Sequence, residues 1–543
     1  MLLFVNQLIG QNFSEILGRP TNTSATMSVL FDQKTEVYFE YGTATGAYPL
    51  HTPTYISVKD TALEVDFINL LPDARYFYRT KYRPAENTGA FQAGPEHSFH
   101  TARPAGSTFT FAIEADPHLD TNSNTLAYSL TLQNVLYKQP DFLLDLGDTF
   151  MSEKLTQKNQ ANITARHLLY RPYFGAVCHS VPLYLVIGNH EGEVGWGLNG
   201  TATSLAVMAS NTRKLFYPNP LPNSFYSGDI KTEPFVGLRG NYYSWEWGNA
   251  LFIVLDPYWY TTVKPDWGWT LGEDQYNWFK NVITSSNAKF KFVFCHQLVG
   301  GKGNDGRGGS EYAGFFENGG ENADSTWGFE VHRPGWEKSI HALMVENHAN
   351  IFFHGHDHCY AKQDKDGLVY QEVPQPSSKN ITNITGTQYG YVEGVLMPSR
   401  GYLLVTVTDS TAKVDYVKTY LPNEATGGHT NGEVAYSYTL KSFVSGMEEE
   451  RKTASTVQMD QNFPNPFNRE TSIRYKVNIA GVVQLKVFDV LGREIAALVN
   501  EYRQPGTYTA CFNSAKYGQT GGVFYYRISG GDCSKCLKMI CVN

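Results

Sequence analysis

Short apolar segments that end abruptly in polar residues recur along the middle of the chain. Segments of this length, rich in β-branched and aromatic residues, predict buried strands, and the stretches between them predict helices. This alternation favours an α/β domain over residues 107–420. The predicted strands occupy residues 108–113, 141–146, 181–187, 251–255, 291–295 and 351–353.

The residues directly after these strands carry carboxylate, amide and imidazole groups. In open α/β sheets the ligand site lies at the carboxyl ends of the strands, so we expect these side chains to converge. The densest cluster is His354-Gly355-His356-Asp357-His358, in which we expect Gly355 to let the backbone turn sharply. An isolated His-x-His pair would more often be structural. The other polar strand ends supply its partners: Asp116, His118, Asp148, Asn189, His190 and His296.

Seven of these residues form an inventory of metal donors: Asp116, His118, Asp148, Asn189, His296, His356 and His358. They offer oxygen and nitrogen atoms and no thiolate, a mixture that suits Fe, Mn or Zn. Seven donors are too many for one tetrahedral ion and fit two ions that share a carboxylate. Two ions ~3.5–4 Å apart can hold both the attacking and the leaving oxygen of a phosphoryl displacement. Asp148, on a short turn after its strand, is placed to bridge them.

The ordered set Asp116-x-His118, Gly147-Asp148, Gly188-Asn189-His190-Glu191, Val293-x-x-His296 and Gly355-His356-x-His358 resembles the calcineurin-like metallophosphoesterase family over the whole middle domain. The resemblance implies a central α/β four-layer sandwich, with two β-sheets flanked by helices. It implies hydrolysis of a small phosphorylated substrate, as a phosphatase or a phosphodiesterase, by a metal-bound hydroxide.

The same resemblance implies a role for each site residue. Two divalent or trivalent transition-metal ions would be bound. One set of ligands would be Asp116, His118 and His358, the other Asn189, His296 and His356, with Asp148 bridging. His190 would face the substrate phosphate and assist the leaving group.

The alternating apolar and polar residues of 23–103 predict a small β-sandwich, and 103–106 reads as a linker after it. Residues 70–79 resemble a corner of fibronectin type III domains, and a sandwich before such a catalytic domain resembles the purple acid phosphatase branch. That branch has Gly in place of His118 and a metal-binding Tyr in place of Met151. The resemblance therefore implies no Tyr–iron colour, with His118 taking the place of the missing Tyr.

A third domain is predicted at the C-terminal end of the chain. Residues 421–455 read as a linker, and a β-rich domain follows over 456–543. Its motifs at 462–468 and 487–494 resemble the C-terminal sorting domain of type IX secretion. The resemblance implies export across a bacterial outer membrane by the type IX machinery and a secreted or cell-surface location. The alternative is a β-sandwich used for binding.

Cysteine is scarce, with seven residues in the chain, and four of them crowd the last domain: Cys511, Cys533, Cys536 and Cys541. The spacing Cys533-x-x-Cys536 occurs in redox and metal sites, but without a βαβ context a disulfide or free thiols are favoured.

The composition limits the function classes that remain. A chain of 543 residues exceeds one hydrophobic core, so several domains are expected, with β-sandwiches at both ends. The formal net charge of -8, with no basic run, excludes a broad nucleic-acid footprint. No apolar run reaches membrane-spanning length. The segment 1–22 starts with apolar residues and is either the remnant of a signal peptide or a plain N-terminus.

Two functional readings remain. The first is a secreted two-metal phosphoester hydrolase, and the second is a surface-displayed binding protein whose phosphoesterase domain is inert. Three residues stay open between a role at the site and a structural one. Arg307 could meet an anionic substrate or lie in a solvated loop, Glu191 could orient a ligand or cap a turn, and His354 is expected behind the ligands.

Overall fold

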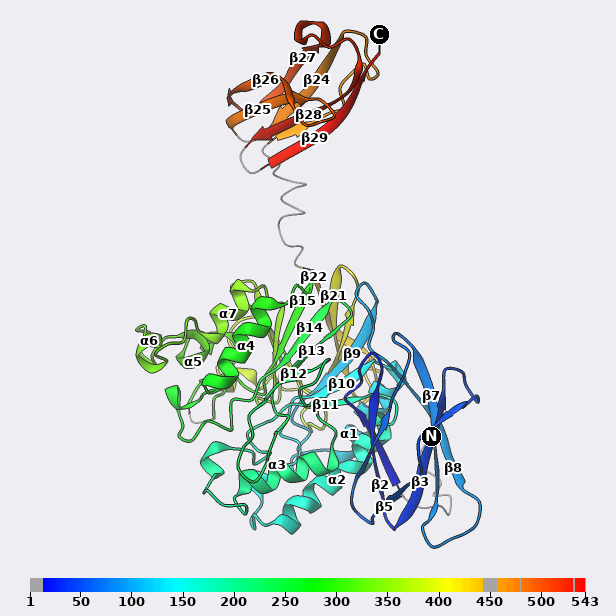
Figure 1. Ribbon diagram of the computed structural model, residues 1–543. Helices are drawn as coiled ribbons and strands as arrows, with labels where there is room; N and C mark the ends of the chain where they lie inside the picture. Colours follow the sequence, from blue (N-terminus) through cyan, green and yellow to red (C-terminus); the bar gives the residue numbers. More distant parts are fainter. Residues whose placement is uncertain (1–12, 304, 443–456, 479, 531–532, 543) are drawn as a thin grey trace. The chain divides into compact units, whose positions relative to one another are not determined.

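The computed structural model describes residues 13–303, 305–442, 457–478, 480–530 and 533–542 (Figure 1). The chain divides into two compact units, Met1–Ser442 and Phe443–Asn543. Residues 1–12, with the apolar start of the chain, and 443–455 of the predicted linker lie outside the described residues. No helix of the described part is long and apolar enough to cross a membrane.

A β-sandwich begins the first unit. Strand β7 (Arg75–Pro84) buries every second residue, as an antiparallel sheet with one solvated face requires. Its core holds Phe39, Phe67 and Tyr78. The Tyr76 hydroxyl accepts a hydrogen bond from the Leu71 N–H at 2.8 Å, the contact that defines a tyrosine corner. One sheet contains β1 (Phe13–Gly18), β2 (Ala25–Phe31) and β6 (Leu63–Phe67), and the other β3 (Thr35–Gly42), β4 (Leu50–His51), β5 (Tyr55–Ser57), β7 and β8 (Gln92–His100).

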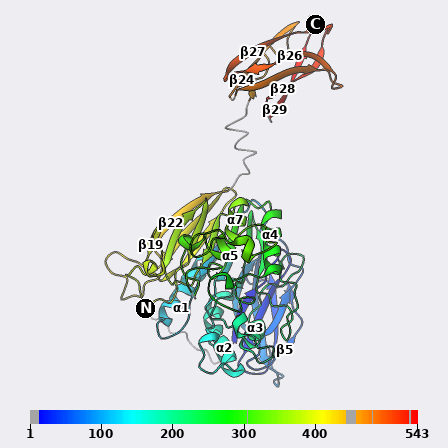
Figure 2. The same ribbon diagram turned by 90° about the vertical axis from the view of Figure 1, so that its left-hand side faces the viewer.

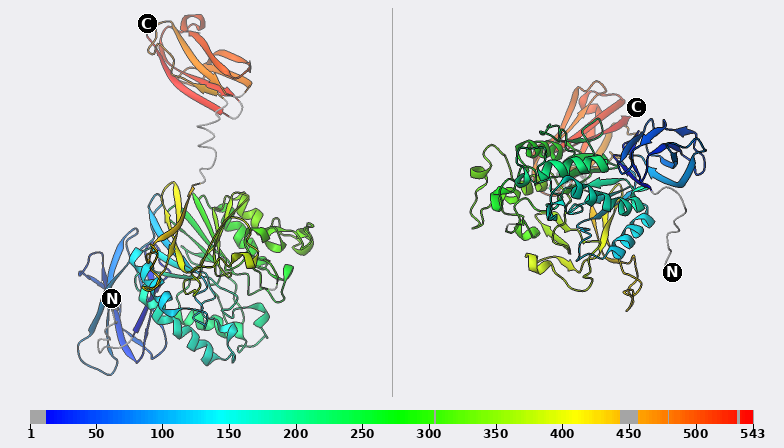
Figure 3. Two further views of the ribbon diagram at one scale, coloured as in Figure 1. Left: turned by 180° about the vertical axis from the view of Figure 1, so that it is seen from behind. Right: turned by 90° about the horizontal axis from the view of Figure 1, so that it is seen from below.

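The first of these sheets continues into the α/β domain. Its order is β22-β21-β20-β9-β10-β11-β1-β2-β6. Strands β9, β10 and β11 are parallel, and Asp145 at the end of β10 pairs with Glu114 and Leu185 on either side. The late strand β20 pairs with the much earlier β9, and β21 and β22 follow it to the edge of the sheet, which is seen from behind in Figure 3. The bounds are β9 Phe109–Glu114, β10 Phe142–Asp145, β11 Leu183–Leu185, β20 Gly401–Val407, β21 Thr411–Lys418 and β22 Val434–Lys441.

A second sheet of eight strands has the order β12-β13-β14-β15-β16-β18-β17-β19. Strands β14, β15 and β16 are parallel and buried throughout, so their carboxyl ends also meet at one edge. The bounds are β12 Ser227–Gly228, β13 Tyr243–Trp247, β14 Ala250–Val254, β15 Phe290–Phe294, β16 Ile351–His354, β17 Tyr360–Lys365, β18 Leu368–Glu372 and β19 Val395–Met397.

Aromatic side chains from both sheets share one hydrophobic core. The Phe111 ring of β9 meets Phe252 of β14 edge-on, with ring centroids 5.1 Å apart, and Phe353 of β16 at 6.5 Å. Phe142 of β10 contacts the same Phe252 at 5.2 Å. Each fully buried ring stabilises the fold by about 1.5–3 kcal/mol. This core fixes the carboxyl ends of the two sheets relative to each other.

Helices cover the outer faces of both sheets. Side chains of α1 (Thr125–Lys138) and α2 (Gln160–Cys178) pack on β10 and β11, and those of α4 (Glu273–Ser285) and α7 (Ile340–Glu346) pack on β14–β16. The side chains of Asn124 and Asn159 cap the N-termini of α1 and α2. Helices α1, α2 and α3 (Leu205–Phe216) lie side by side (Figure 2). Two short helices, α5 (Phe316–Gly319) and α6 (Phe329–His332), complete the domain.

The structure extends two of the predicted regions. Strand β1 lies in the segment 1–22, which the sequence left outside the sandwich, and pairs with β2 over six residues. It has no alternating pattern because its last four residues are all buried. Strand β22 lies in the predicted linker 421–455 and pairs with β21 at the edge of the nine-stranded sheet.

The second unit is a β-sandwich of its own. Its core contains Ile473, Leu485 and Tyr526. Cys511, Cys536 and Cys541 are free thiols, and the side chain of Cys533 lies outside the described part. One sheet contains β23 (Val457–Met459), β24 (Glu470–Val477) and β27 (Gly506–Asn513), and the other β25 (Gly481–Phe488), β26 (Glu494–Arg503), β28 (Gly522–Gly530) and β29 (Cys533–Cys541).

A buried arginine joins helix α2 to the first sandwich. The Arg171 guanidinium donates hydrogen bonds to the Ser14 and Ser28 carbonyls of β1 and β2, at 3.1 and 3.0 Å, and to the Phe216 carbonyl at 2.6 Å. Its side chain is fully enclosed. Without it, three buried carbonyl groups would lose a charged donor.

We therefore expect Arg171→Leu to lower the free energy of unfolding by on the order of 3 kcal/mol, since buried acceptors left unpaired keep their full desolvation cost. All nine tryptophans lie between residues 196 and 336, so tryptophan fluorescence in urea reports on the α/β domain. The control is Arg83→Leu, which removes a partly exposed pair with Glu36 and should cost about 1 kcal/mol or less. Equal midpoints for the two variants would contradict this role of Arg171.

Candidate metal centre

The predicted site residues lie at the carboxyl ends of five strands, where the two sheets face each other. Strands β9, β10 and β11 of the nine-stranded sheet lead into Asp116 and His118, into Asp148, and into Asn189 and His190. Strand β15 leads into His296, and β16 leads into His356 and His358. The six predicted strands all form, and the structure brings all the predicted site residues together.

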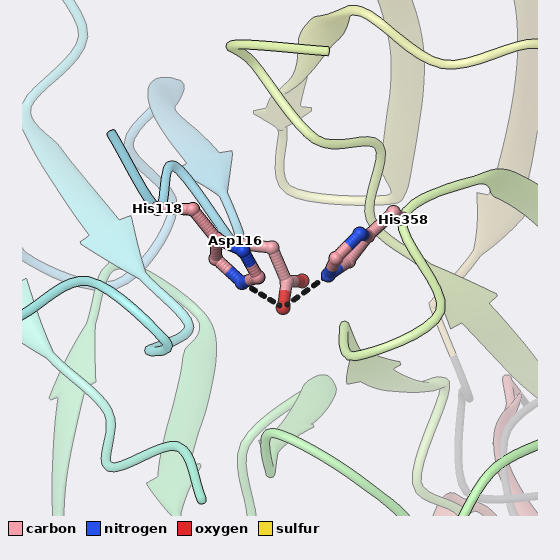
Figure 4. Close-up of side chains that lie close together, drawn as sticks. All are labelled: Asp116, His118 and His358. Carbon is pink, nitrogen blue, oxygen red and sulfur yellow. Dashed lines mark ion pairs between the residues drawn. The ribbon is translucent and has the colours of Figure 1, made fainter. Parts of the chain in front are cut away.

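Asp116, His118 and His358 form one group of side chains (Figure 4). The Asp116 Oδ1 atom lies 3.6 Å from His118 Nε2 and 3.4 Å from His358 Nε2. The two imidazole rings are 4.5 Å apart and perpendicular. These distances leave space for an ion among the three atoms.

Asp148, His296 and His356 form a second group. The His296 Nε2 atom lies 3.3 Å from Asp148 Oδ2 and 3.3 Å from His356 Nδ1. The other ring nitrogen of His296, Nδ1, donates to the Leu146 carbonyl at 2.8 Å. That hydrogen bond fixes the tautomer and leaves the Nε2 lone pair for a metal.

The two groups adjoin each other through the carboxylates. Asp148 Oδ2 lies 3.8 Å from His118 Nε2, which belongs to the first group. Asp116 Oδ1 lies 3.8 Å from His296 Nε2, which belongs to the second. Asp148 therefore contacts both groups, the position that a bridging ligand requires.

Unpaired polar atoms mark the interior of this cluster. Among the described residues, four buried donor or acceptor atoms of the predicted ligands have no hydrogen-bond partner: Asp116 Oδ1, His118 Nε2, Asn189 Oδ1 and His356 Nε2. A buried polar atom without a partner costs about 1–3 kcal/mol, so such a concentration needs a compensating ligand. Oxygen and imidazole nitrogen atoms are donors for Fe, Mn and Zn, and the donor set fits two such ions.

The electrostatics of the site favour cations. Burial alone would raise the pKa of Asp116, but His296 and His358 hold it well below its usual range. Burial likewise opposes the charged form of His296, and the carboxylates of Asp148 and Asp116 outweigh this and raise its pKa to about 9. The buried carboxylates of Asp116 and Asp148 therefore favour the binding of cations at this site.

Most of the predicted ligands have a left-handed backbone. The φ angles are 58° for Asp116, 53° for His118, 55° for Asp148, 82° for His356 and 55° for His358. Such conformations cost on the order of 1–3 kcal/mol each and cluster where function requires a side-chain direction. In this site, the left-handed residues direct the ligand side chains toward the cluster directly after each strand.

The expectation that Gly355 makes the sharp turn of the backbone is wrong. Its φ is not in the left-handed region, and the turn is made by His356. Instead, a Cβ atom on Gly355 would lie 2.7 Å from Asp116 Oδ2 and 2.8 Å from the Ala115 Cβ. The glycine is needed because the His356 N–H donates to Asp116 Oδ2 at 2.8 Å, which brings the two backbones close together.

Glu191 holds the turn that presents Asp148. Its buried carboxylate accepts hydrogen bonds from the N–H groups of Asp148 at 2.9 Å and Gly188 at 2.5 Å through Oε2, and from those of Thr149 at 2.6 Å and Phe150 at 3.2 Å through Oε1. Burial raises the pKa of this carboxyl to about 7. Of the two readings open for Glu191, the structure favours orientation of a ligand.

Two further residues left open by the sequence are structural. Arg307 donates to the His356 carbonyl at 3.1 Å and to Asp357 Oδ1 at 2.8 Å, so it braces the turn of β16. His354 Nδ1 lies 2.8 Å from Glu372 Oε2, outside both groups.

Three residues beside the cluster escaped the sequence analysis. Asp120 Oδ2 lies 3.7 Å from His118 Nδ1, and Glu153 Oε2 lies 3.3 Å from His190 Nδ1. Arg166 of α2 donates to the His118 carbonyl at 3.1 Å. Asp120 and Glu153 follow a motif residue by a few positions, which is the only local signal. Arg166 has none, because a helix brings it to the site.

A cavity of about 400 Å³ opens beside the first group and His190. Its lining comes from the loop after His118, from η1 (Ser152–Lys154) and its neighbours, and from α2. Substrate could therefore reach His190 and the cluster from this side. The lining residues are His118, Asp120, Asn122, Met151, Lys154, Leu155, Arg166, His190 and His358.

Comparisons with known proteins give the family of the α/β domain. Residues 109–360 match the sequence model of the family described as calcineurin-like phosphoesterase. This part of the chain is a calcineurin-like phosphoesterase domain, and the predicted enzyme class, a phosphoester hydrolase, is confirmed. The family implies a two-metal centre. Among curated proteins, no sequence matches the chain.

Two solved structures are similar to this chain. One is described as the structure of PhoD, with a TM-score of 0.57 and 16% identity, over 79% of this chain and 90% of that one. The other is the purple acid phosphatase PPD1 from seeds of yellow lupin, Lupinus luteus, with a TM-score of 0.52 and 14% identity, over 79% of this chain and 74% of that one. At such identities the similarity concerns the fold.

The contacts of Glu191 lead to a prediction. In Glu191→Gln the amide nitrogen cannot accept a hydrogen bond, so N–H groups at the Asp148 turn lose their acceptor, at about 1–3 kcal/mol each. We expect the variant to melt earlier and to retain less metal per chain after loading and desalting, measured by elemental mass spectrometry. The matched control Glu153→Gln, beside His190, should keep the wild-type metal content. Full metal and an unchanged melting temperature in Glu191→Gln would refute this role.

Proposed function

We propose that the protein is a secreted, two-metal phosphoester hydrolase. The observation that carries the proposal is the convergence of four unpaired buried polar atoms from the ends of β9 and β11 and from the β16 turn. In this assignment, Asp116, His118 and His358 would hold one ion. Asn189, His296 and His356 would hold the other, and Asp148 would be shared. The domain would have the four-layer arrangement of the family, with a helical layer outside each sheet.

The chain's own residues set the geometry of the reaction. When bound, the two ions would lower the pKa of a coordinated water to roughly 7 and so supply the nucleophile, and they would neutralise charge on the phosphate. Asp148, whose N–H donates a hydrogen bond to Glu191, would position the two ions. Asp116 and the imidazoles exclude bulk water, because all but His358 are buried.

His190 is the residue proposed to assist the leaving group. Its Nε2 lies 3.8 Å from Asp148 Oδ2, at the mouth of the cavity. Its backbone N–H donates to Asp148 Oδ1 at 2.7 Å, which ties its position to that of the proposed shared ligand. On the other side of the ring, Nδ1 faces Glu153 at 3.3 Å, and contact with His190 lowers the pKa of Glu153 to about 2. A charged Glu153 on this side of the ring orients the imidazole, so that its other nitrogen can serve the leaving oxygen.

The second candidate function is a surface-displayed binding protein with an inert phosphoesterase domain. Against it stands the completeness of the site. A purely structural domain has no need for left-handed backbone at five ligand positions or for four unpaired buried polar atoms. Both features cost stability, and bound metal would offset that cost by satisfying the unpaired atoms.

Two substitutions separate metal binding from chemistry. We expect Asp148→Asn to lose both bound metal and turnover of an aryl phosphate. His190→Ala should keep the metal and lower kcat by about 10²–10⁴, the usual contribution of a general acid. Metal content is measured beside turnover of aryl mono- and diesters, after loading with Mn, Zn or Fe. Activity of Asp148→Asn equal to wild type would refute the site, and inactivity of the loaded wild type on both ester classes would favour the binding protein.

The terminal domains support the proposed location. The motifs within 462–468 and 487–494 lie in a separately compact β-sandwich, as a removable or anchoring sorting domain would require. The first sandwich, with its hydrogen bond between Tyr76 and Leu71, fits the fibronectin type III-like assignment. We propose that the last domain is recognised by the type IX secretion machinery.

Fusion of residues 456–543 to a periplasmic reporter tests this assignment. In a host with the type IX system, we expect the reporter at the cell surface or in the medium, because the domain carries the export signal. The same fusion in a strain without the system should stay in the periplasm. Retention of the reporter in both strains would contradict the proposal.

A further inference from the structure

The cavity beside His190 has a mixed lining that the hydrolysis of phosphate does not require. Met151 and Leu155 form an apolar wall, and Lys154 and Arg166 add two cations. Because His190 faces the leaving oxygen in the proposed mechanism, the group attached to that oxygen would occupy this cavity. Its volume of about 400 Å³ lies within the range of small-molecule sites, ~300–1,000 Å³.

Arg166 is a cation held in a fixed orientation. Its Nε donates to the Phe150 carbonyl at 2.8 Å, and its Nη2 donates to the His118 carbonyl at 3.1 Å. The guanidinium contacts no carboxylate among the described ion pairs, so its charge is not neutralised within the described part of the chain. A planar guanidinium that is already oriented is well suited to bind a carboxylate or phosphate oxygen.

Lys154 adds a second, adjustable cation. Its Nζ lies 3.8 Å from Glu153 Oε2, beyond hydrogen-bond distance, and the side chain is 57% exposed. Glu153 is also engaged with His190, at 3.3 Å, so it compensates Lys154 only in part. The ammonium can therefore reach into the cavity toward an anion.

The acidic group on the cavity wall does not cancel these charges. Asp120 accepts hydrogen bonds from the Asn122 N–H at 2.8 Å and the Ser123 hydroxyl at 3.1 Å. Its other oxygen lies 3.7 Å from His118 Nδ1, on the side of the imidazole away from Asp116. The charge of Asp120 is thus directed to the proposed ligand His118, and it does not pair with Lys154 or Arg166 among the described ion pairs.

We propose that Arg166 and Lys154 form an anion site for the leaving group, so that the substrates are phosphate esters whose organic part carries a second anionic group. This inference rests on the proposed function. The apolar wall of Met151 and Leu155 would contact the body of the organic group, and the two cations would bind the carboxylate or phosphate at its far end. Specificity then comes from the charge of the leaving group.

A matched pair of substrates tests the inference with the metal-loaded full-length protein. Para-carboxyphenyl phosphate and its amide, para-carbamoylphenyl phosphate, have nearly the same shape and differ in one negative charge. We expect kcat/KM to be about tenfold higher for the acid, which corresponds to about 1.4 kcal/mol, with most of the difference in KM. The preference should shrink at high salt, because a partly exposed ion pair is screened.

Variants identify the residues responsible. In Lys154→Gln and Arg166→Gln, the ratio of kcat/KM for acid over amide should fall toward one. The ratio cancels any loss of metal in Arg166→Gln, whose side chain also supports the His118 turn. The matched control is Lys158→Gln. Lys158 lies 3.7 Å from the same Glu153 as Lys154 but outside the cavity lining, so the wild-type ratio should persist.

Two outcomes would overturn the inference while leaving the proposed hydrolase intact. The first is hydrolysis of both substrates with a ratio near one in the wild type. The second is a high ratio that neither Lys154→Gln nor Arg166→Gln reduces. Failure of the loaded wild type to hydrolyse either substrate, or any aryl mono- or diester, would instead refute the proposed function on which the inference rests.

Discussion

Two buried carboxylates that lie beside the same imidazoles, those of His118 and His296, are the constraint around which this domain is built. Asp116 and Asp148 are both less than 2% exposed, and both carry pKa values held well below the usual range by imidazoles, against the opposing effect of burial. A buried charge is tolerated only when it is paired or bound to a metal. Four imidazoles lie within 3.8 Å of these carboxylates, those of His118, His190, His296 and His358. The strand ends of both sheets supply this compensation.

The two sheets contribute different chemistry. The carboxylates and the amide follow β9, β10 and β11, whereas three of the four imidazoles proposed as ligands follow β15 and β16. Neither sheet alone holds a complete donor set for two ions. The aromatic core between the sheets therefore has a functional consequence, because a shift of one sheet past the other would separate oxygen donors from nitrogen donors. Rigid packing of rings such as Phe111 and Phe252 resists that shift.

The sequence predicted those site residues whose position depends only on neighbouring residues in the chain. Each predicted ligand follows a buried strand within a few residues, so the apolar run predicts both the strand and the position of its polar end. That is why Asp116, Asp148 and His296 could be found without a structure. The contacts of Glu191 with four N–H groups could not, because they depend on two turns meeting. Strand β1 was missed because its burial follows from contact with β2 and α2 and leaves no alternation to read.

Helix α2 illustrates how a residue without a local signal acquires a role. Arg166 and Arg171 lie five positions apart on this helix. Arg171 is bound to carbonyls of β1 and β2, and Arg166 is bound to carbonyls of His118 and Phe150. The first sandwich thus fixes the helix that carries the cation of the cavity wall. In this structure the N-terminal domain is part of the framework of the site, since its strands continue the catalytic sheet and its backbone holds α2 in place. The backbone of β1 and β2 in the first sandwich therefore affects, through helix α2, the cavity wall that would contact the substrate.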